Sequence, residues 1–145
     1  MAETFEIHLE DRSEEVLAAL QNAIERALMA MGGTAVRHAA RNLDKQGAVD
    51  TGRLKGSLDY IVEIGDGESA MYVGTNVNYA PYIELGTGHY SLTGGGTPKE
   101  SWVYKDKFGK WHRAYPRPAR PYLKPALADH TDEYWSLLED SLKNA

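Results

Sequence analysis

Residues 13–45 read SEEVLAALQNAIERALMAMGGTAVRHAARNLDK, and this stretch decides the fold. Its apolar side chains recur every three or four positions, the spacing that aligns them on one face of an α-helix. The predicted stripe consists of Leu17, Leu20, Ile24, Leu28, Met31, Ala35, Ala39 and Leu43. A helix of this length spans about 45 Å, so we expect the other elements to pack along it.

The ends and the middle of this helix carry local signals. Asp11 or Ser13 provides an N-terminal cap, and the helix is expected to close at Gln46. Gly32 and Gly33 lie in its middle, where each glycine costs about 1 kcal/mol relative to alanine. They predict a kink or a close approach by another backbone.

Short alternating segments predict strands around the helix. Apolar and polar residues alternate over residues 5–9, which predicts a strand with one solvated face. Residues 58–64 and 70–75 predict a hairpin, and residues 102–105 and 110–113 predict a second one, whose turn ends in glycine.

The remaining segments predict turns and a last helix. Residues 49–57 indicate a single helical turn capped by Asp50, and residues 79–85 indicate another. Residues 115–121 must be extended, because each proline biases its predecessor out of the helical region. A final helix from about 121 to 143 is expected to bury Leu123, Leu127, Tyr134, Leu137, Leu138 and Leu142.

These elements predict one α+β domain in a chain of 145 residues. A long N-terminal helix packs on a small antiparallel β-sheet, followed by a protruding loop and hairpin and a C-terminal helix. We place the core in residues 1–85 and 118–145 and the protruding region in residues 86–117. Residues 86–98 are rich in Gly, Ser and Thr and predict a flexible loop.

Composition excludes several classes of protein. The chain contains no cysteine, which removes disulfides, thiolate nucleophiles and sulfur-ligated zinc, and which suits a reducing compartment. The first residues are acidic where a secretory signal is basic, and the longest apolar run, residues 27–31, is far shorter than a membrane span. We therefore expect a soluble protein made in the cytoplasm, with no membrane partner.

Charge is concentrated in one segment. Residues 1–98 carry a net charge of −7 and residues 125–145 carry −4, whereas residues 99–124 carry +6. Six of the 14 aromatic residues lie in this cationic segment. The candidate contact residues are Trp102, Tyr104, Lys105, Lys107, Phe108, Lys110, Trp111, Arg113 and Arg117.

Three interpretations of this segment stay open. Its aromatic residues can pack on their own hairpin, they can form a protein interface rich in Trp, Tyr and Arg, or they can stack on nucleic acid. The total charge of −5 argues against nonspecific nucleic-acid binding, which depends on a net cationic surface. We favour the protein interface.

No catalytic, cofactor or metal motif is apparent in the sequence. The histidines show no spacing typical of metal ligands, and no serine lies in a Gly-x-Ser-x-Gly elbow. The run Gly94-Gly95-Gly96 lacks the spacing and the preceding strand of a phosphate loop. We therefore expect a protein that is not an enzyme and that uses no cofactor and no metal.

Three segments together carry a family resemblance. Residues 49–58, VDTGRLKGSL, match the pattern V-D-T-G-x-L-x-x-S. Residues 73–87, VGTNVNYAPYIELGT, match V-G-x-x-x-x-Y-A-x-Y-x-E-x-G-T, and residues 118–126, PARPYLKPA, resemble A-R-P-F-L-x-P-A, with Tyr122 in the place of Phe. With this order and spacing the chain resembles the tail-component family of tailed bacteriophages and prophages, whose members are neck, tail-completion or head-to-tail joining proteins.

The resemblance implies a structural virion protein at the head–tail junction, assembled in the bacterial cytoplasm. It implies a homo-oligomeric ring, commonly six-fold, that contacts neck or connector proteins and tail-tube or tail-terminator proteins around the DNA path. The DNA in the lumen is a further partner, contacted nonspecifically, and a DNA-binding module is the alternative function. The Gly-rich loop and the tryptophan hairpin differ from the family pattern in length.

The residues that match the family motifs are expected mainly to fix the fold. Asp50 is expected to cap its turn through Arg53, and Glu84 to pair with Arg53 or Arg120. The motif residues are Asp50, Thr51, Gly52, Leu54, Gly74, Tyr79, Ala80, Tyr82, Glu84, Gly86, Thr87, Ala119, Arg120, Pro121, Leu123 and Pro125.

Overall fold

The α1 helix (Ser13–Gln46) is the axis of the molecule. A computed structural model describes residues 6–46, 51–87 and 101–145, apart from the side chains of Thr51 and Trp102. The helix continues for 34 residues, so the predicted long helix is confirmed. At its start Asp11 Oδ1 accepts a hydrogen bond from the Ser13 N–H at 3.0 Å, so Asp11 binds a free donor of the first turn, although the carbonyl of Arg12 accepts the first helical hydrogen bond.

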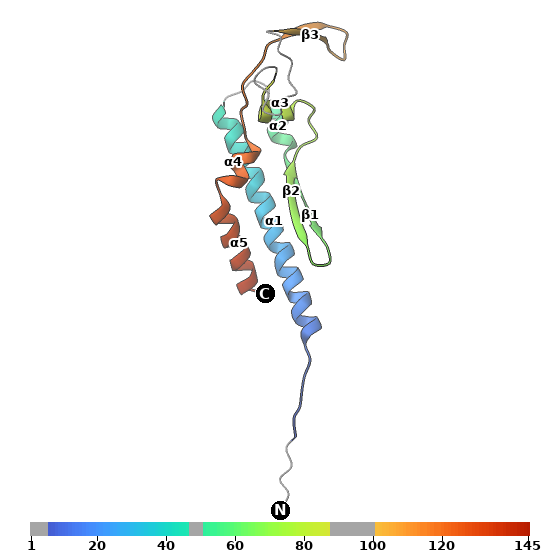
Figure 1. Cartoon of the computed structure of the whole chain (residues 1–145), viewed down its shortest axis with the longest axis vertical. Coiled ribbons are helices and arrows are strands. Elements are labelled where there is room, and N and C mark those ends of the chain that lie inside the picture. Colours follow the sequence, from blue (N-terminus) through green and yellow to red (C-terminus); the bar gives the residue numbers. More distant parts are fainter. Residues whose placement is uncertain (1–5, 47–50, 88–100) are drawn as a thin grey trace, which may run out of the picture.

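The other elements lie along both sides of α1 and beyond its C-terminal end (Figure 1). One side carries the antiparallel hairpin of β1 and β2, and the other carries α4 and α5. Beyond the end of α1, the β3–β4 hairpin projects from the molecule as a second two-stranded sheet. The bounds are α2 Thr51–Ser57, β1 Asp59–Ile64, β2 Ser69–Gly74, α3 Ala80–Leu85, β3 Trp102–Lys105, β4 Trp111–Ala114, α4 Leu123–Ala128 and α5 Thr131–Lys143.

These elements confirm the α+β class, both predicted hairpins and the helical turns at residues 51–57 and 80–85. Gly86 follows α3 with φ 82°, a conformation that glycine adopts without strain. The cap expected from Asp50 lies outside the described residues. Within the described ranges, no helix combines the length and apolar character needed to cross a lipid bilayer.

Gly32 is the point at which the β1–β2 hairpin seats on α1. It is buried, and a Cβ added to it would overlap the aromatic ring of Tyr60 on β1. The close approach predicted at this glycine therefore occurs, but the neighbour is an aromatic side chain rather than a backbone. Gly33 is different, since an added Cβ would meet only the Arg37 guanidinium at 3.7 Å.

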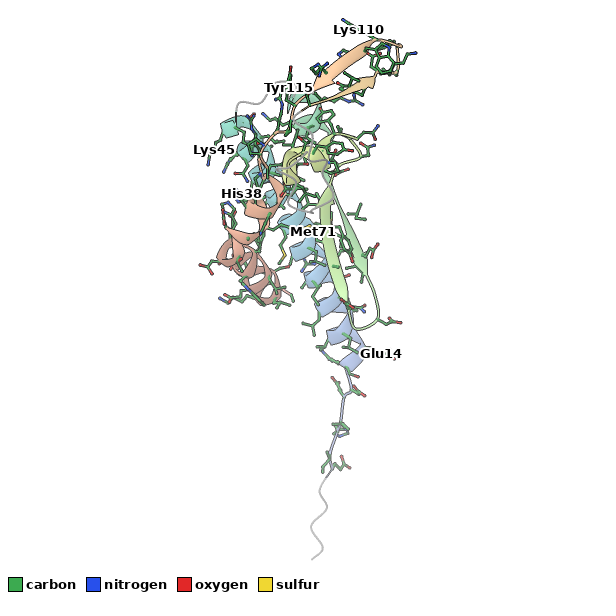
Figure 2. All side chains as sticks on the ribbon, turned by 45° about the horizontal axis from the view of Figure 1, so that its top comes forward. Glu14, His38, Lys45, Met71, Lys110 and Tyr115 are labelled. Atoms are coloured by element: carbon green, nitrogen blue, oxygen red, sulfur yellow. The ribbon has the colours of Figure 1, made fainter. Side chains whose placement is uncertain are left out.

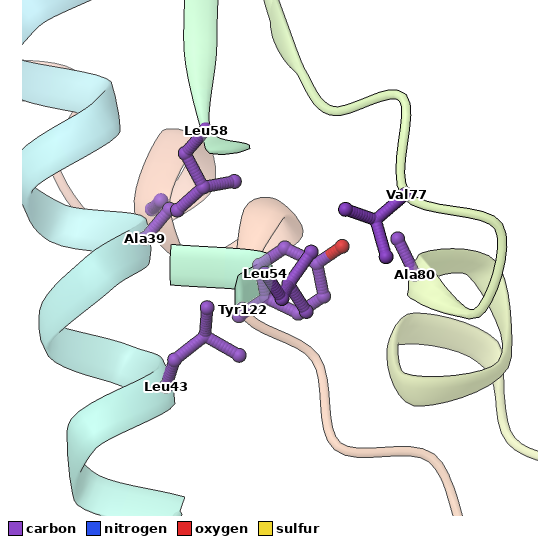
Figure 3. Close-up of a cluster of buried hydrophobic side chains, with 8 residues drawn as sticks. Ala39, Leu43, Leu54, Leu58, Val77, Ala80 and Tyr122 are labelled. Carbon is purple, nitrogen blue, oxygen red and sulfur yellow. The ribbon is translucent and has the colours of Figure 1, made fainter. Parts of the chain in front are cut away.

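The core lies where the C-terminal part of α1 meets α2, α3 and α4 (Figure 3). Its largest fully buried side chains are Tyr122, Leu43 and Leu54. Burial of an apolar side chain of this size contributes roughly 1.5–3 kcal/mol. Around these three pack Ala39, Leu58, Val77, Ala80 and Ala126.

The predicted strand over residues 5–9 is wrong in its described part. Residues 6–9 form no strand, and Ile7 and Leu9 are both 89% exposed. No second strand of the described chain lies beside this segment to accept its backbone hydrogen bonds. An alternating pattern without a partner strand does not make a sheet.

The predicted single C-terminal helix is two helices. The chain leaves helical geometry at His130, between α4 and α5, and the Tyr134 hydroxyl donates to the Ala126 carbonyl across the break. Of the face expected to be buried, Leu127 and Leu142 are exposed and the other four residues are half-buried.

The apolar stripe of α1 is buried only in its C-terminal half. Ala35, Ala39 and Leu43 are buried, whereas Leu17 is 60% exposed. The neighbouring α5 ends near Ala23, whose carbonyl accepts a hydrogen bond from the Ser141 hydroxyl at 2.6 Å. The first turns of α1 extend past it, so no described element covers them.

Candidate functional site

The β3–β4 hairpin carries most of the predicted contact residues and stands apart from the body (Figure 2). Lys110 lies at its tip and Tyr115 at its base. Among the described residues its two strands pack mainly on each other, with at most weak contact to any other element. A two-stranded hairpin is marginally stable in water, so its own turn has to supply much of its order.

Asp106 builds that turn. Its Oδ1 accepts hydrogen bonds from the backbone N–H groups of Phe108 and Lys110, both at 2.9 Å. Its Oδ2 lies 2.7 Å from His112 Nε2, and Gly109 turns the chain with φ 81°. The hydrogen bond from His112 and then that from Lys110 lower the pKa of Asp106, so this carboxylate stays ionised.

The register divides the hairpin into two unlike faces. Tyr104 is opposite His112, their rings stack with centroids 5.3 Å apart, and His112 is half-buried. The other face pairs Val103 with Arg113 and Lys105 with Trp111, and all four are exposed. We call this second face, made of Val103, Lys105, Trp111 and Arg113, the arm face.

Aromatic and cationic side chains lie together on the β3–β4 hairpin and its base, residues 101–117, which we call the arm. Lys105 Nζ is 5.8 Å from the centroid of the Trp111 ring, and Lys107 Nζ is 5.1 Å from that of Phe108. Trp111 is 65% exposed and Phe108 is 84% exposed. Stacking on His112 holds the Tyr104 ring, which is still 48% exposed, and the arm face and the tip are open to solvent as well. For Trp102 the structure describes the backbone alone.

The base of the arm is tied to α3. Arg117 N donates to Thr87 Oγ1 at 2.8 Å, and Thr87 N donates to the Arg117 carbonyl at 2.9 Å. Arg120 N donates to the Ile83 carbonyl at 2.7 Å. Residues 115–121 form no helix or strand, as predicted, and their backbone bonds fix the point from which the arm projects.

Glu84 joins the central and the last family-like segments. Its Oε2 accepts the N–H groups of Tyr122 at 2.7 Å and Leu123 at 3.0 Å, and its Oε1 accepts that of Lys124 at 2.9 Å. These are the free backbone donors at the start of α4, where a carboxylate is favoured. The expected pairing with Arg53 or Arg120 is wrong, because the carboxylate binds backbone N–H groups instead.

Tyr122 packs beside this carboxylate in the core. Burial, and then the charges of Glu84 and Tyr79, raise the pKa of Tyr122 to about 12. Its ring packs with Leu54 from the first family-like segment and Ala80 from the second. The three segments thus meet around one buried tyrosine.

The other motif residues surround this junction or lie on its rim. The Pro121 carbonyl accepts a hydrogen bond from Gln46 Nε2 at 2.9 Å, and the Pro125 carbonyl accepts one from Asp129 N at 3.0 Å. Gly52 and Tyr82 are exposed, so burial does not explain their presence. Gly74, Tyr79, Ala119 and Leu123 are half-buried.

An acidic surface that sequence reasoning did not single out lies on β1–β2. The outward side chains Asp59, Ile61 and Glu63 of β1 and Tyr72 of β2 are exposed, and Ile61 is directly opposite Tyr72. We call these four residues the body face. An open hollow of about 530 Å³ continues from it around the turn of the hairpin and is lined in part by Glu63, Asp66 and Glu68.

A second group that sequence spacing could not reveal lies where α1 meets α5. His38 Nε2 is 2.8 Å from Glu133 Oε2, and the His38 ring stacks on that of His130 with centroids 3.5 Å apart. His38 and His130 are 92 positions apart, so no local pattern connects them.

The comparisons with known proteins identify no relative: no family model matches the chain, and neither a curated protein nor a solved structure is significantly similar to it.

Proposed function

We propose that this chain is a structural protein of a tailed bacteriophage or prophage that forms a ring at the head–tail junction, as a neck or tail-completion protein. The observation that carries the proposal is the junction at Tyr122. Three sequence segments that resemble one family meet there through the Glu84 carboxylate and the buried Leu54. Their contact in one buried cluster supports the interpretation that the three segments work together as one structural motif.

The ring would close through unlike surfaces on successive subunits. In a head-to-tail ring, one surface of each subunit contacts a different surface of the next. The arm, residues 101–117, carries five cationic residues and one acidic residue, whereas the β1–β2 hairpin, residues 59–74, carries four acidic residues and no cationic one. Charge complementarity therefore favours a contact between the arm of one subunit and the β1–β2 hairpin of its neighbour.

The two faces also match in chemical pattern. The arm face places Val103 and Trp111 beside Lys105 and Arg113, and the body face places Ile61 and Tyr72 beside two carboxylates. Buried aromatic centres with a charged rim are typical of specific protein interfaces. In this arrangement the apolar side chains supply affinity, while the charges at the rim orient the subunits.

Within the virion the ring would lie between the connector and the tail tube. The family resemblance supports a six-fold ring around the DNA path, with neck, connector, tail-tube or tail-terminator proteins as partners. The apolar side chains exposed on the first turns of α1, Val16 and Leu17, are available for one of these partners.

The test is the state of the protein alone and in particles. Sedimentation velocity and negative-stain images of the purified protein are expected to show rings at high concentration. Mass spectrometry of purified virions from a host strain carrying the gene is expected to detect the chain. A monomer at every concentration, combined with absence from virions, would overturn the proposal.

The second candidate is a DNA-binding module, favoured by the exposure of Trp111 between Lys105 and Arg113. Such a surface can stack on bases and contact phosphates. It predicts binding to duplex DNA that weakens steeply as salt rises. Fluorescence anisotropy at low salt decides, because an absence of binding there excludes this candidate.

A further inference from the structure

We propose that His38, His130 and Glu133 form a binding site for a divalent transition-metal ion, with Zn²⁺ as the best fit, which fastens α5 to α1. The three residues come from different elements. His38 lies in α1, His130 at the break before α5 and Glu133 in the first turn of α5. One ligand atom from each lies within 4.8 Å of the others.

Two of the three distances between the ligand atoms bracket the value around a tetrahedral ion, and the third, between His38 and His130, is within 4.8 Å. Zinc binds histidine nitrogen and carboxylate oxygen at about 2.0–2.2 Å, so two of its ligand atoms stand about 3.3 Å apart. Glu133 Oε2 is 2.8 Å from His38 Nε2 and 3.7 Å from His130 Nδ1, which brackets this value. Two imidazoles and one carboxylate form the ligand set of known catalytic zinc sites, with a water molecule in the fourth position.

The arrangement leaves bonding capacity that a cation would use. At 3.7 Å the contact between His130 and Glu133 is too long for a hydrogen bond, so this carboxylate closes on only one of the two rings. The rings stack nearly parallel, at 7°, with their edges toward the same carboxylate. To aim both lone pairs at one ion the rings must fan apart, so metal binding requires the His130 ring, whose side chain is 34% exposed, to turn out of the stack.

The ligands differ in burial in a way that lets an ion reach the site. The side chain of His38 is only 12% exposed, whereas that of Glu133 is 46% exposed, so an ion can enter from solvent and be held against the helix. Arg37 is the adjacent cation on α1, and its guanidinium is held by Thr34 Oγ1 at 2.9 Å. A metal here would connect α1 to α5 just after the break in the C-terminal helical region.

The experiment uses the full chain without a histidine tag. Isothermal titration with Zn²⁺ is expected to show one ion per chain, and titration with Co²⁺ to give the visible absorption of a tetrahedral site. His38→Gln and His130→Gln are expected to weaken Zn²⁺ binding at least about 10-fold. The matched control is His112→Gln, which removes a histidine that also faces a carboxylate, at 2.7 Å, but lies outside the cluster.

A measurement on the unaltered chain keeps the proposal testable if a variant fails to fold. Zn²⁺ is expected to protect His38 and His130, but not His112, from acylation by diethyl pyrocarbonate, read by mass spectrometry of peptides. Equal protection of all three histidines, or binding that His38→Gln and His130→Gln leave unchanged, would overturn the proposal. So would an absence of binding by the folded chain.

Discussion

The two β-hairpins of this protein have the same architecture and opposite surroundings. β1–β2 lies along α1, seats the Tyr60 ring against Gly32 and presents an acidic outer face. Among the described residues, β3–β4 packs mainly on itself; the hydrogen bonds of Asp106 order its turn, and it presents a cationic, aromatic face. The first hairpin is part of the fold, whereas the second projects from it with its aromatic and cationic side chains exposed.

We therefore expect the body of the molecule to determine the free energy of unfolding and the arm to determine association. A side chain that supports the body contributes to the free energy of unfolding, because its loss opens a cavity or leaves backbone groups unbonded. A side chain on the arm face contributes little to folding, since it is exposed before and after. Substitutions in the two regions are therefore expected to affect different measurements.

The largest effect on stability is expected at Glu84, where the chain returning from the arm rejoins the body. Glu84→Ala removes the acceptor of three backbone N–H groups and is expected to lower the free energy of unfolding by about 2–4 kcal/mol. Urea denaturation measures it. The control, Glu63→Ala on the exposed body face, is expected to change stability by less than about 0.5 kcal/mol. Equal effects would contradict the division.

High pH tests the core of the body at Tyr122. The fold raises the pKa of this residue to about 12, from the ordinary tyrosine value of 10.0 that applies in the unfolded chain. The folded state therefore keeps a proton that the unfolded state loses, so this contribution is complete below pH 10 and falls as the pH rises toward 12. Between about pH 9 and 12 the wild type is expected to lose roughly 2 kcal/mol more stability than Tyr122→Phe. Parallel stability curves would count against it.

Substitutions at two adjacent glycines test whether β1–β2 packs on α1 through the contact of Tyr60 with Gly32. Gly32→Ala places a methyl group into the Tyr60 ring and is expected to destabilise the protein by about 1–3 kcal/mol. Gly33→Ala, one position on, meets only a flexible guanidinium and is expected to stabilise the helix by up to about 1 kcal/mol. Thermal unfolding of both variants checks the signs, and the same sign for both would disprove this contact.

The smallest effect on global stability is expected in the arm. Asp106→Ala removes the turn acceptor for Phe108 and Lys110, so the amide hydrogens of the arm should exchange faster with solvent. Because the arm packs mainly on itself, the free energy of unfolding is expected to change by less than about 0.5 kcal/mol. Hydrogen exchange measures the opening of the arm, and urea denaturation measures the free energy of unfolding. A large global loss would show that the arm belongs to the core.

Local sequence patterns predicted the elements correctly where a neighbouring element packs against the patterned segment. The long helix, both hairpins and the turn ending at Gly86 are present, since helix periodicity and glycine positions are local signals. The strand predicted for residues 5–9 is absent from residues 6–9, beside which the described part of the chain places no second strand. The stripe on α1 failed at Leu17, because the length of α5 decides what is covered there.

Long-range contacts are what the sequence could not supply. Whether the Glu84 carboxylate pairs with an arginine or binds the N–H groups at the start of α4 depends on how α3 lies beside Tyr122, which is 38 positions later in the chain. The meeting of His38 with Glu133 depends on the break before α5, which no residue pattern announced. The cationic segment could be located by counting charges, but its two faces required the register of β3–β4.

The central claim is that the arm face of one subunit binds the body face of the next, and an exchange of charges tests it. The first variant, Lys105→Glu with Arg113→Glu, reverses the charge of the arm face. The second, Asp59→Lys with Glu63→Lys, reverses that of the body face. The control, Glu139→Lys with Asp140→Lys, reverses two charges on α5, outside both faces.

Sedimentation velocity at low salt is the measurement that decides. The wild type and the control are expected to associate, each charge-exchanged variant alone to stay monomeric, and an equimolar mixture of the two to associate again, because every contact in it regains opposite charges. Association of either variant alone to the level of the wild type, or a mixture that stays monomeric, would contradict the claim.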